Sequence, residues 1–68
     1  MKIMYCGEEI GTITTNRSMT AEEALYIIGY DVNDADDCEK AYRDGFEPAY
    51  LDDMAHYQID LEGIELVY

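Results

Sequence analysis

Two short runs rich in β-forming residues open the chain and predict a β-hairpin. Residues 2–6 (KIMYC) stop at a glycine, and residues 10–15 (IGTITT) follow with several β-branched side chains. A turn at Gly7–Glu8 places Tyr5 opposite Ile10 on one face of the pair. A second glutamate follows this turn and permits a longer loop, so the pattern predicts the hairpin more firmly than its register.

Residues 20–29 have the features of a short amphipathic helix. Thr20 is a candidate N-cap, and Glu23 three residues later completes the pattern of a capping box. Gly29 is placed to end the helix, because glycine commonly follows the last helical residues. Apolar residues recur at helical spacing, which predicts a buried stripe along one face. The stripe consists of Ala21, Ala24, Leu25 and Ile28.

A second helix is expected over residues 34–44, preceded by a turn at residues 31–34 and terminated by Gly45. The residues expected to face inward are Cys38, Ala41 and Tyr42. Oppositely charged residues four positions apart, with the acid first, favour a solvated outer surface on this helix. The two pairs are Asp36 with Lys40 and Glu39 with Arg43.

The last third of the chain changes from a helical to a strand-like pattern. Pro48 forces Glu47 toward an extended backbone, so the helical pattern breaks there. Over residues 57–62, apolar and polar residues alternate, which is typical of a half-buried strand. After Gly63 the apolar face moves to the even positions of residues 64–68. This shift predicts a bulge or tight turn at which Gly63 adopts a positive φ.

The order of elements is therefore β-β-α-α-β, with a further strand after the shift. This order is typical of an α+β fold in which two helices pack on one face of a short antiparallel sheet. The 68-residue chain is expected to form a single compact domain over residues 1–68, because two domains would not fit.

The composition adds a strong acidic bias to this fold. Sixteen acids against four bases give a net charge of −12, while 49% hydrophobic residues supply material for a folded core. The negative charge argues against direct binding to nucleic acid or to an anionic membrane. No apolar run approaches the roughly 18 to 20 residues of a membrane span, and no stretch has the pattern of a signal peptide. We therefore expect a cytoplasmic protein.

Cysteine and histidine give little indication of catalytic or metal chemistry. Cys6 and Cys38 are far apart and lack CxxC spacing, which favours two free thiols in a reducing compartment over a disulfide. The acidic run at residues 31–37 does not fit the EF-hand pattern, and His56 has no Cys or His at zinc-ligand spacing. We expect no enzyme, no cofactor and no metal, since so short a chain leaves little room for a substrate pocket.

The acidic residues concentrate in the second half of the chain. Residues 1–30 carry four acids and two bases, whereas residues 31–68 carry twelve acids and two bases. Carboxylates on one helix face lie about 5 to 6 Å apart, and a nucleic-acid strand carries one charge per ~3.4 Å, so the two charge densities are comparable. Such a surface, interleaved with tyrosine, suits a partner rich in Lys and Arg. The alternative is that the acidic face is only solvated and binds nothing. The residues expected to contact a partner are Asp34, Asp36, Asp37, Asp52, Asp53, Asp60, Glu62, Tyr50 and Tyr57.

In size, charge and composition, the chain resembles the small acidic anti-CRISPR and antirestriction proteins that phages and mobile elements encode. The resemblance rests on no motif and assigns no site residues. It implies a non-enzymatic inhibitor that mimics nucleic acid on a basic nucleic-acid-binding protein, with a CRISPR effector as the first expected target and a restriction-type nuclease as the second. The alternative is a small structural or adaptor module. Such a module would act through a homodimer formed by the apolar faces of residues 57–61 and 64–68, or through another protein–protein interface.

Overall fold

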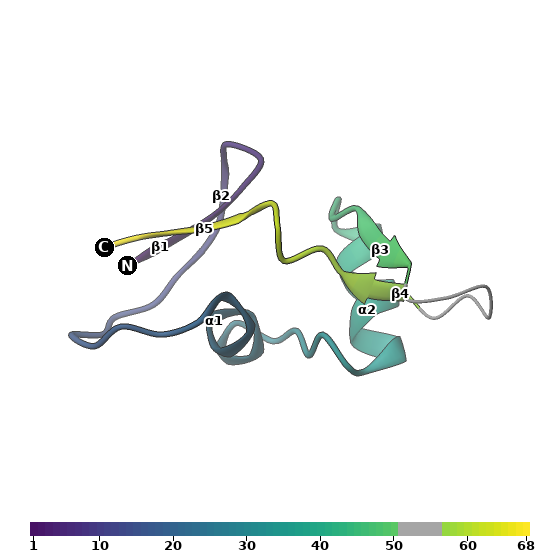
Figure 1. The fold of residues 1–68 in the computed structure, drawn as a ribbon, viewed down its shortest axis with the longest axis horizontal. Coiled ribbons are helices and arrows are strands. Elements are labelled where there is room, and N and C mark those ends of the chain that lie inside the picture. The colour runs from purple at the N-terminus through teal and green to yellow at the C-terminus, as the bar shows by residue number, and fades with distance from the viewer. Residues whose placement is uncertain (51–56) are drawn as a thin grey trace.

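The structure is a computed structural model that describes residues 1–50 and 57–68, with side chains for residues 1–49 and 58–68. It shows an α+β fold with the order of elements predicted from the sequence, and one additional short strand, β3 (Figure 1). All strand pairs are antiparallel, also as predicted. The elements are β1 (Lys2–Tyr5), β2 (Glu8–Thr12), α1 (Ala21–Ile27), α2 (Ala35–Arg43), β3 (Pro48–Tyr50), β4 (Tyr57–Ile59) and β5 (Ile64–Val67).

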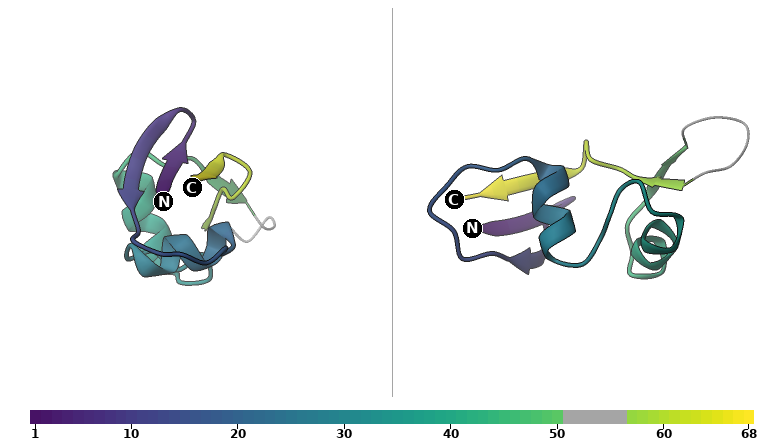
Figure 2. Two further views of the ribbon diagram at one scale, coloured as in Figure 1. Left: turned by 90° about the vertical axis from the view of Figure 1, so that its left-hand side faces the viewer. Right: turned by 90° about the horizontal axis from the view of Figure 1, so that it is seen from below.

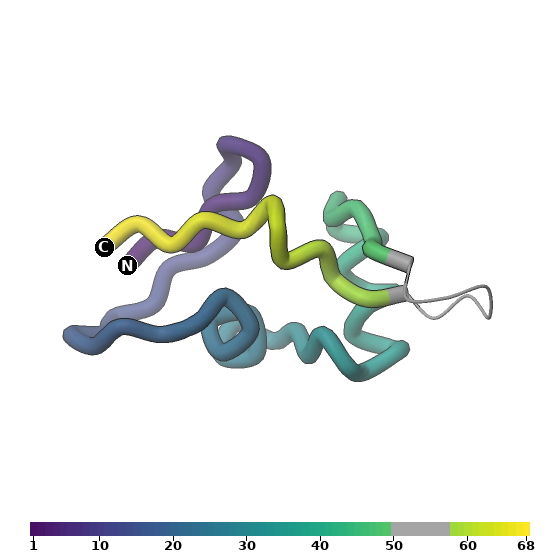
Figure 3. The backbone as a smooth tube through the Cα atoms, viewed as in Figure 1, coloured from purple at the N-terminus to yellow at the C-terminus, as the bar shows by residue number. Residues whose placement is uncertain are grey.

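The strands are divided between two small sheets at opposite ends of the molecule. β1 lies between β2 and β5 in a three-stranded sheet, and β3 pairs with β4 in a separate two-stranded sheet. Figure 2 shows α1 lying across the three-stranded sheet, while α2 packs against β4 at the other end. The chain crosses between these ends at residues 28–34 and 60–63, so the molecule is elongated, 39 × 20 × 17 Å (Figure 3).

The turn between β1 and β2 lies one residue earlier than the sequence predicted. Cys6 and Gly7 form the turn with φ values of 49° and 88°, and Tyr5 pairs with Glu8 instead of Ile10. A turn with two positive φ values matches the right-handed twist of the flanking strands, which favours this two-residue connection. A bulge further along the pair allows Ile10 to pack against the core.

Both helices end at the glycines that the sequence indicated. Gly29 follows α1 with a φ of 108°, and Gly45 follows α2 with a φ of 106°. In each case the next residue donates its N–H back to a carbonyl in the last turn, at 2.9 Å for Tyr30 and 3.0 Å for Phe46. This arrangement, a Schellman motif, satisfies carbonyls that the helix leaves without partners and returns an aromatic side chain to the core.

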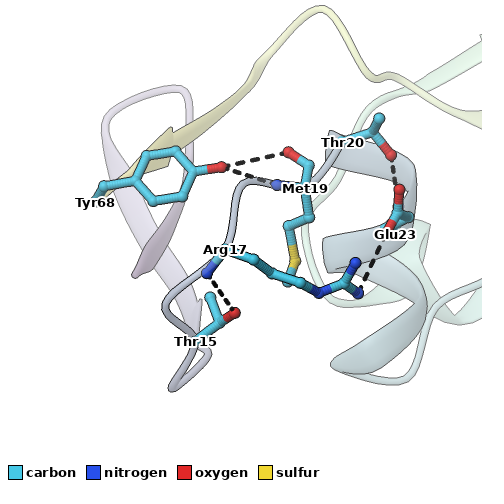
Figure 4. Close-up of polar contacts among 6 residues, drawn as sticks. All are labelled: Thr15, Arg17, Met19, Thr20, Glu23 and Tyr68. Carbon is cyan, nitrogen blue, oxygen red and sulfur yellow. Dashed lines mark hydrogen bonds and ion pairs between the residues drawn. The ribbon is translucent and has the colours of Figure 1, made fainter.

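The connection between β2 and α1 forms polar contacts with residues of α1 and with Tyr68 (Figure 4). The N–H of Glu23 donates to the side-chain oxygen of Thr20 at 3.2 Å, which confirms Thr20 as the N-cap of α1. The carboxylate of Glu23 forms an ion pair with Arg17, with 3.6 Å between the charged atoms, so the second half of the predicted capping box is not formed. The hydroxyl of Tyr68 accepts the N–H of Met19 at 3.1 Å.

The core consists of two clusters that partly buried isoleucines connect. Ile10, Ile28 and Ile64 pack against both clusters. The cluster beneath the three-stranded sheet comprises Ile3, Ile13 and Ala24. The larger cluster comprises Tyr5, Leu25, Val32, Cys38, Ala41, Phe46 and Ile59. Tyr42, which the helical spacing placed inside, is 57% exposed, because Phe46 folds back after α2 and packs in the core.

Tyr5 connects the two ends of the molecule. Its ring lies 4.9 Å from that of Phe46, and its hydroxyl accepts the N–H of Glu47 at 3.1 Å. Gly63 lies directly against this ring, since a Cβ at that position would come within 2.6 Å of the Tyr5 Cε2 atom. Gly63 does not adopt the positive φ that the shift in apolar parity predicted. The glycine is required by close packing, and not by backbone conformation.

The first and last strands run side by side, so the two ends of the described chain are neighbours. Lys2 on β1 pairs with Val67 on β5 in antiparallel register (Figure 1). The helices are short, with seven residues in α1 and nine in α2. Within residues 1–50 and 57–68, no helix has the length and apolar character needed to cross a membrane.

Candidate functional site

Most of the acidic residues belong to one segment of the chain. Residues 30–62, named here the acidic half, hold eleven of the sixteen acids and two of the four bases. This segment contains α2 and the two-stranded sheet. No charged side chain is buried among the residues that the structure describes. The acids of this segment therefore remain accessible to solvent and to a partner wherever they are described.

The N-terminus of α2 gathers several of these acids into a hydrogen-bonded group. The Asp34 carboxylate accepts the N–H groups of Asp36 and Asp37 at 2.9 and 3.1 Å, which makes Asp34 the N-cap. The Asp37 carboxylate accepts the N–H of Asp31 at 3.1 Å, and the Asp31 carboxylate accepts the N–H of Asn33 at 2.9 Å. Three carboxylates are thus held in place by backbone donors and stabilised by the positive end of the helix dipole.

These hydrogen bonds separate structural acids from acids that are free to contact a partner. The sequence predicted Asp34, Asp36 and Asp37 as contacts and ranked Asp37 above Asp36, because Lys40 four residues on was expected to pair with Asp36. The structure does bring the three acids together. However, Asp34 and Asp37 hold the entry to α2, whereas the exposed carboxylate of Asp36 accepts no hydrogen bond from the described residues. Asp36 is therefore the member of this group best suited to a contact outside the molecule.

Replacing the helix cap is expected to destabilise the fold more than replacing its neighbour. Asp34→Ala should lower the free energy of unfolding by about 1 kcal/mol, because two backbone N–H groups lose their acceptor. Asp36→Ala, a matched change two residues away, should cost only a few tenths of a kcal/mol through the helix dipole. Urea denaturation followed by circular dichroism measures both. Equal losses for the two variants would contradict the assignment of Asp34 as the cap.

The outer face of α2 carries both signs of charge without the predicted ion pairs. Asp36, Glu39, Lys40 and Arg43 are exposed at helical spacing. The one ion pair found in the described parts of the chain joins Glu23 on α1 to Arg17, which precedes that helix. Lys40 instead places its ammonium group 5.1 Å from the centre of the Tyr30 ring, in a cation–π contact.

A carboxylate lies at the C-terminus of α2, where its interaction with the helix dipole is unfavourable, and a hydrogen bond from a tyrosine offsets this interaction. Asp44 is the C-cap, where the negative end of the helix dipole disfavours an acid. The hydroxyl of Tyr30 donates a hydrogen bond to the Asp44 carboxylate. Burial and this hydrogen bond raise the pKa of Tyr30 from 10.0 to about 12.

This raised pKa predicts a loss of stability at high pH. Between pH 10 and about 12, Tyr30 loses its proton in the unfolded chain but keeps it in the folded protein, so the free energy of unfolding falls over this range. The contribution is fully present below pH 10. Thermal melts at pH 9 and pH 11.5 should show a smaller fall for Tyr30→Phe than for the unaltered protein. An equal fall in both proteins would show that Tyr30 does not contribute.

The remaining predicted contacts lie on or near the two-stranded sheet. The Asp60 carboxylate accepts the N–H of Glu62 at 3.0 Å and so shapes the turn between β4 and β5, while Glu62 is exposed. Tyr50 and Tyr57 are paired in register on β3 and β4, so the structure places their backbones opposite each other. The predicted contacts Asp52 and Asp53 lie outside the described residues, as does His56.

Neither cysteine is in a disulfide, and the two differ in environment. Cys6 is exposed in the hairpin turn, whereas Cys38 is on the buried face of α2. The Cys38 thiol donates to the carbonyl of Val32 at a sulfur–oxygen distance of 3.4 Å. Burial raises the pKa of this thiol, which keeps it protonated and unreactive. Among residues 1–50 and 57–68, no group of three or more His, Cys, Asp or Glu side chains is arranged to hold a metal ion.

Sequence reasoning overlooked two features of this surface. The turn at residues 31–34 was predicted, but the hydrogen bonds of the Asp31 and Asp44 carboxylates were not. The Asp-x-Asn spacing at residues 31–33 is a signal for a turn that a side chain stabilises. The outer face of α1 was assigned no role, yet it borders a groove of about 630 Å³ that extends to residues 31–33. Tyr26 and Ile27, which lie off the apolar stripe of this helix, were the available signal.

No protein-family model matches this chain, and comparisons with curated proteins and with solved structures also found no match.

Proposed function

We propose that this protein is a non-enzymatic inhibitor that binds the nucleic-acid groove of a basic protein. The target we propose is a CRISPR effector, with a restriction-type nuclease second, as for the anti-CRISPR proteins that phages encode. The observation that carries the proposal is the net charge of −12, together with the concentration of eleven of the sixteen acids in residues 30–62. Because these acids are not buried where they are described and lack ion-pair partners there, their charge remains available to an external cation.

The fold supports this role by fixing part of the charge before binding. Asp31, Asp34 and Asp37 are each held by backbone N–H groups at 2.9 to 3.1 Å. These three carboxylates keep a fixed negative charge beside the free carboxylate of Asp36, and this charge adds to the field that attracts a basic partner. Carboxylates spaced by about 5 to 6 Å on a helix also approach the charge spacing of a nucleic-acid strand.

The expected consequence of this charge is rapid, salt-sensitive association. A strongly negative surface steers toward a positively charged groove and raises the association rate at low ionic strength. Competition with nucleic acid follows, since both ligands would occupy the same positive surface. The contacts we propose are the exposed acids of the acidic half, chiefly Asp36 and Glu62, together with the predicted residues Asp52 and Asp53.

A cleavage assay with a controlled order of addition tests the proposal. A guide-loaded CRISPR effector is incubated with this protein before or after target DNA is added, and cleaved DNA is quantified. We expect strong inhibition when the protein is added first and weaker inhibition when the DNA is already bound. A panel of effectors and restriction nucleases whose cleavage is unchanged at protein concentrations well above that of the nuclease would refute the proposed function.

A second candidate function is a homodimeric adaptor, which the position of β5 favours. β5 is an edge strand of the three-stranded sheet, and Val67 and Tyr68 are exposed at its end. The apolar face predicted for this interface is largely occupied elsewhere, because Ile59 is buried in the core and Ile64 packs against it. Sedimentation velocity over a hundredfold concentration range distinguishes the two functions, since the adaptor must dimerise and the inhibitor need not.

A further inference from the structure

A groove lies on the outer face of α1, away from the three-stranded sheet. It has a volume of about 630 Å³ and is bounded by α1, by the residues before it and by the connection to α2. This volume is within the range of pockets that hold a ligand of moderate size. We name it the α1 groove, and the residues that define it for the argument are Arg17, Glu22, Tyr26, Ile27, Asp31 and Val32.

Two large apolar side chains of α1 are exposed at the α1 groove and do not take part in the core. Tyr26 and Ile27 are 69% and 52% exposed, although α1 has only seven residues and buries Ala24 and Leu25 on its other face. Val32, which also lines the groove, is almost fully buried. Large apolar side chains exposed beside a hollow are typical of a surface that covers a partner's side chain.

The charge at the α1 groove is negative and only partly compensated. Glu22, Glu23 and Asp31 line it together with a single base, Arg17. Arg17 extends toward Glu23, with 3.6 Å between the charged atoms (Figure 4). Glu22 and Asp31 are therefore left without a cation among the described residues, and both border the same hollow as Tyr26.

We infer that the α1 groove receives an arginine side chain from the basic protein partner, an inference that rests on the proposed function and adds a specific contact to it. The aliphatic stem would lie on Ile27, and the guanidinium group would stack on the Tyr26 ring. Glu22 and Asp31 would then accept its N–H groups. Arginine fits this site better than lysine, because a planar guanidinium stacks on an aromatic ring and presents several donors in one plane.

Charge complementarity excludes the other simple occupants. A second copy of this chain would bring another net charge of −12 to a negative groove. A nucleic acid or an anionic lipid would be repelled for the same reason. A purely apolar segment would remove water from Glu22 and Asp31 without supplying a cation, which is costly for carboxylates.

Nuclear magnetic resonance titration with a small probe tests this inference without the nuclease. The probe is the capped peptide acetyl-Gly-Arg-Gly-amide, and its counterpart with citrulline in place of arginine has nearly the same shape but no charge. We expect arginine-specific shifts of backbone amides concentrated within residues 22–33. Shifts that are absent, that are equal for citrulline, or that spread evenly over residues 30–50 and 58–62 would overturn the inference.

Matched variants test the side chains themselves. Tyr26→Ala should weaken binding of the arginine peptide about three- to fivefold, the expected effect of losing an exposed cation–π contact. Val67→Ser, which truncates an exposed apolar residue on β5, should leave binding unchanged. Circular dichroism of both variants checks that the fold is retained. Glu22→Gln is a second test variant, and it should fold normally because the Glu22 side chain is exposed. Unchanged binding by both Tyr26→Ala and Glu22→Gln would contradict the inference.

The outcome of this titration is separable from that of the cleavage assay. If the nuclease is inhibited but the peptide does not bind at residues 22–33, the groove inference is wrong and the proposed function stands. If the peptide binds there but no nuclease is inhibited, the proposed function is wrong, and the groove remains an arginine site for another basic protein.

Discussion

Replacing Gly63 by valine is expected to lower the free energy of unfolding by about 3 kcal/mol, which is about a third or more of the stability of so small a protein. The new Cβ would lie 2.6 Å from the Tyr5 Cε2 atom, and the two additional methyl groups would meet the same crowded region. Overpacking of this kind costs about 3 kcal/mol. The total stability expected for 68 residues is only about 3 to 10 kcal/mol, so this loss is a large part of it. Urea denaturation, followed by circular dichroism and by tyrosine fluorescence, measures the effect.

A double-mutant cycle identifies the cause of this loss. Gly63→Ala should be costly in the native protein but much less so in a Tyr5→Leu background, because the smaller side chain removes the atoms that the Cβ meets. The coupling between the two sites should lie in the range of about 0.5 to 3 kcal/mol expected for residues in contact. If the two changes are additive, the glycine is required by its backbone conformation, as the sequence first indicated, and the packing explanation is wrong.

The second large effect concerns binding to the nuclease that the cleavage assay identifies. Reversing Asp36 and Glu62 to lysine should weaken the complex by about 1 to 3 kcal/mol for each residue, because each change replaces an attraction by a repulsion. Both side chains are exposed, and neither carboxylate accepts a hydrogen bond that the fold requires. The fold should therefore survive the two reversals, which thermal melts can verify.

The matched control reverses two exposed acids outside the acidic half. Glu8→Lys with Glu65→Lys changes the net charge by the same amount as the Asp36 and Glu62 reversals, but on the three-stranded sheet. If binding depends on a local surface, this control should weaken the complex much less. Equal losses for the two double variants would show that only the overall charge matters. Asp37, a contact predicted from the sequence, is unsuitable for this test because its carboxylate supports the turn before α2.

Local signals in the sequence predicted the ends of the helices and the class of the fold. Thr20, Gly29 and Gly45 each act through contacts within a few residues, so a short stretch of sequence contains the information needed to place them. The position of Gly63 was also found from the pattern, but the reason for it was not. The ring of Tyr5 that requires a glycine there lies 58 residues earlier in the chain, and no local pattern can show that approach.

Features that depend on long-range packing were the ones that the sequence could not predict. The exposure of Tyr42 follows from the return of Phe46 to the core, where it packs against Tyr5. The division of the strands between two sheets depends on which strand pairs with β1, and pairing partners are not visible in strand patterns. The predicted acid cluster at α2 was found by composition, yet composition could not distinguish Asp34, which caps the helix, from Asp36, which does not.

The central claim is that the exposed charge of the acidic half binds a basic groove. The most direct measurement is the affinity of the protein for its target nuclease as sodium chloride rises from about 0.1 to 0.5 M, a range over which the screening length shortens from about 10 Å to a few ångströms. The claim predicts a steep fall in affinity for the unaltered protein and a shallower fall for the Asp36 and Glu62 reversals. An affinity that is insensitive to salt, and the same in both proteins, would contradict it.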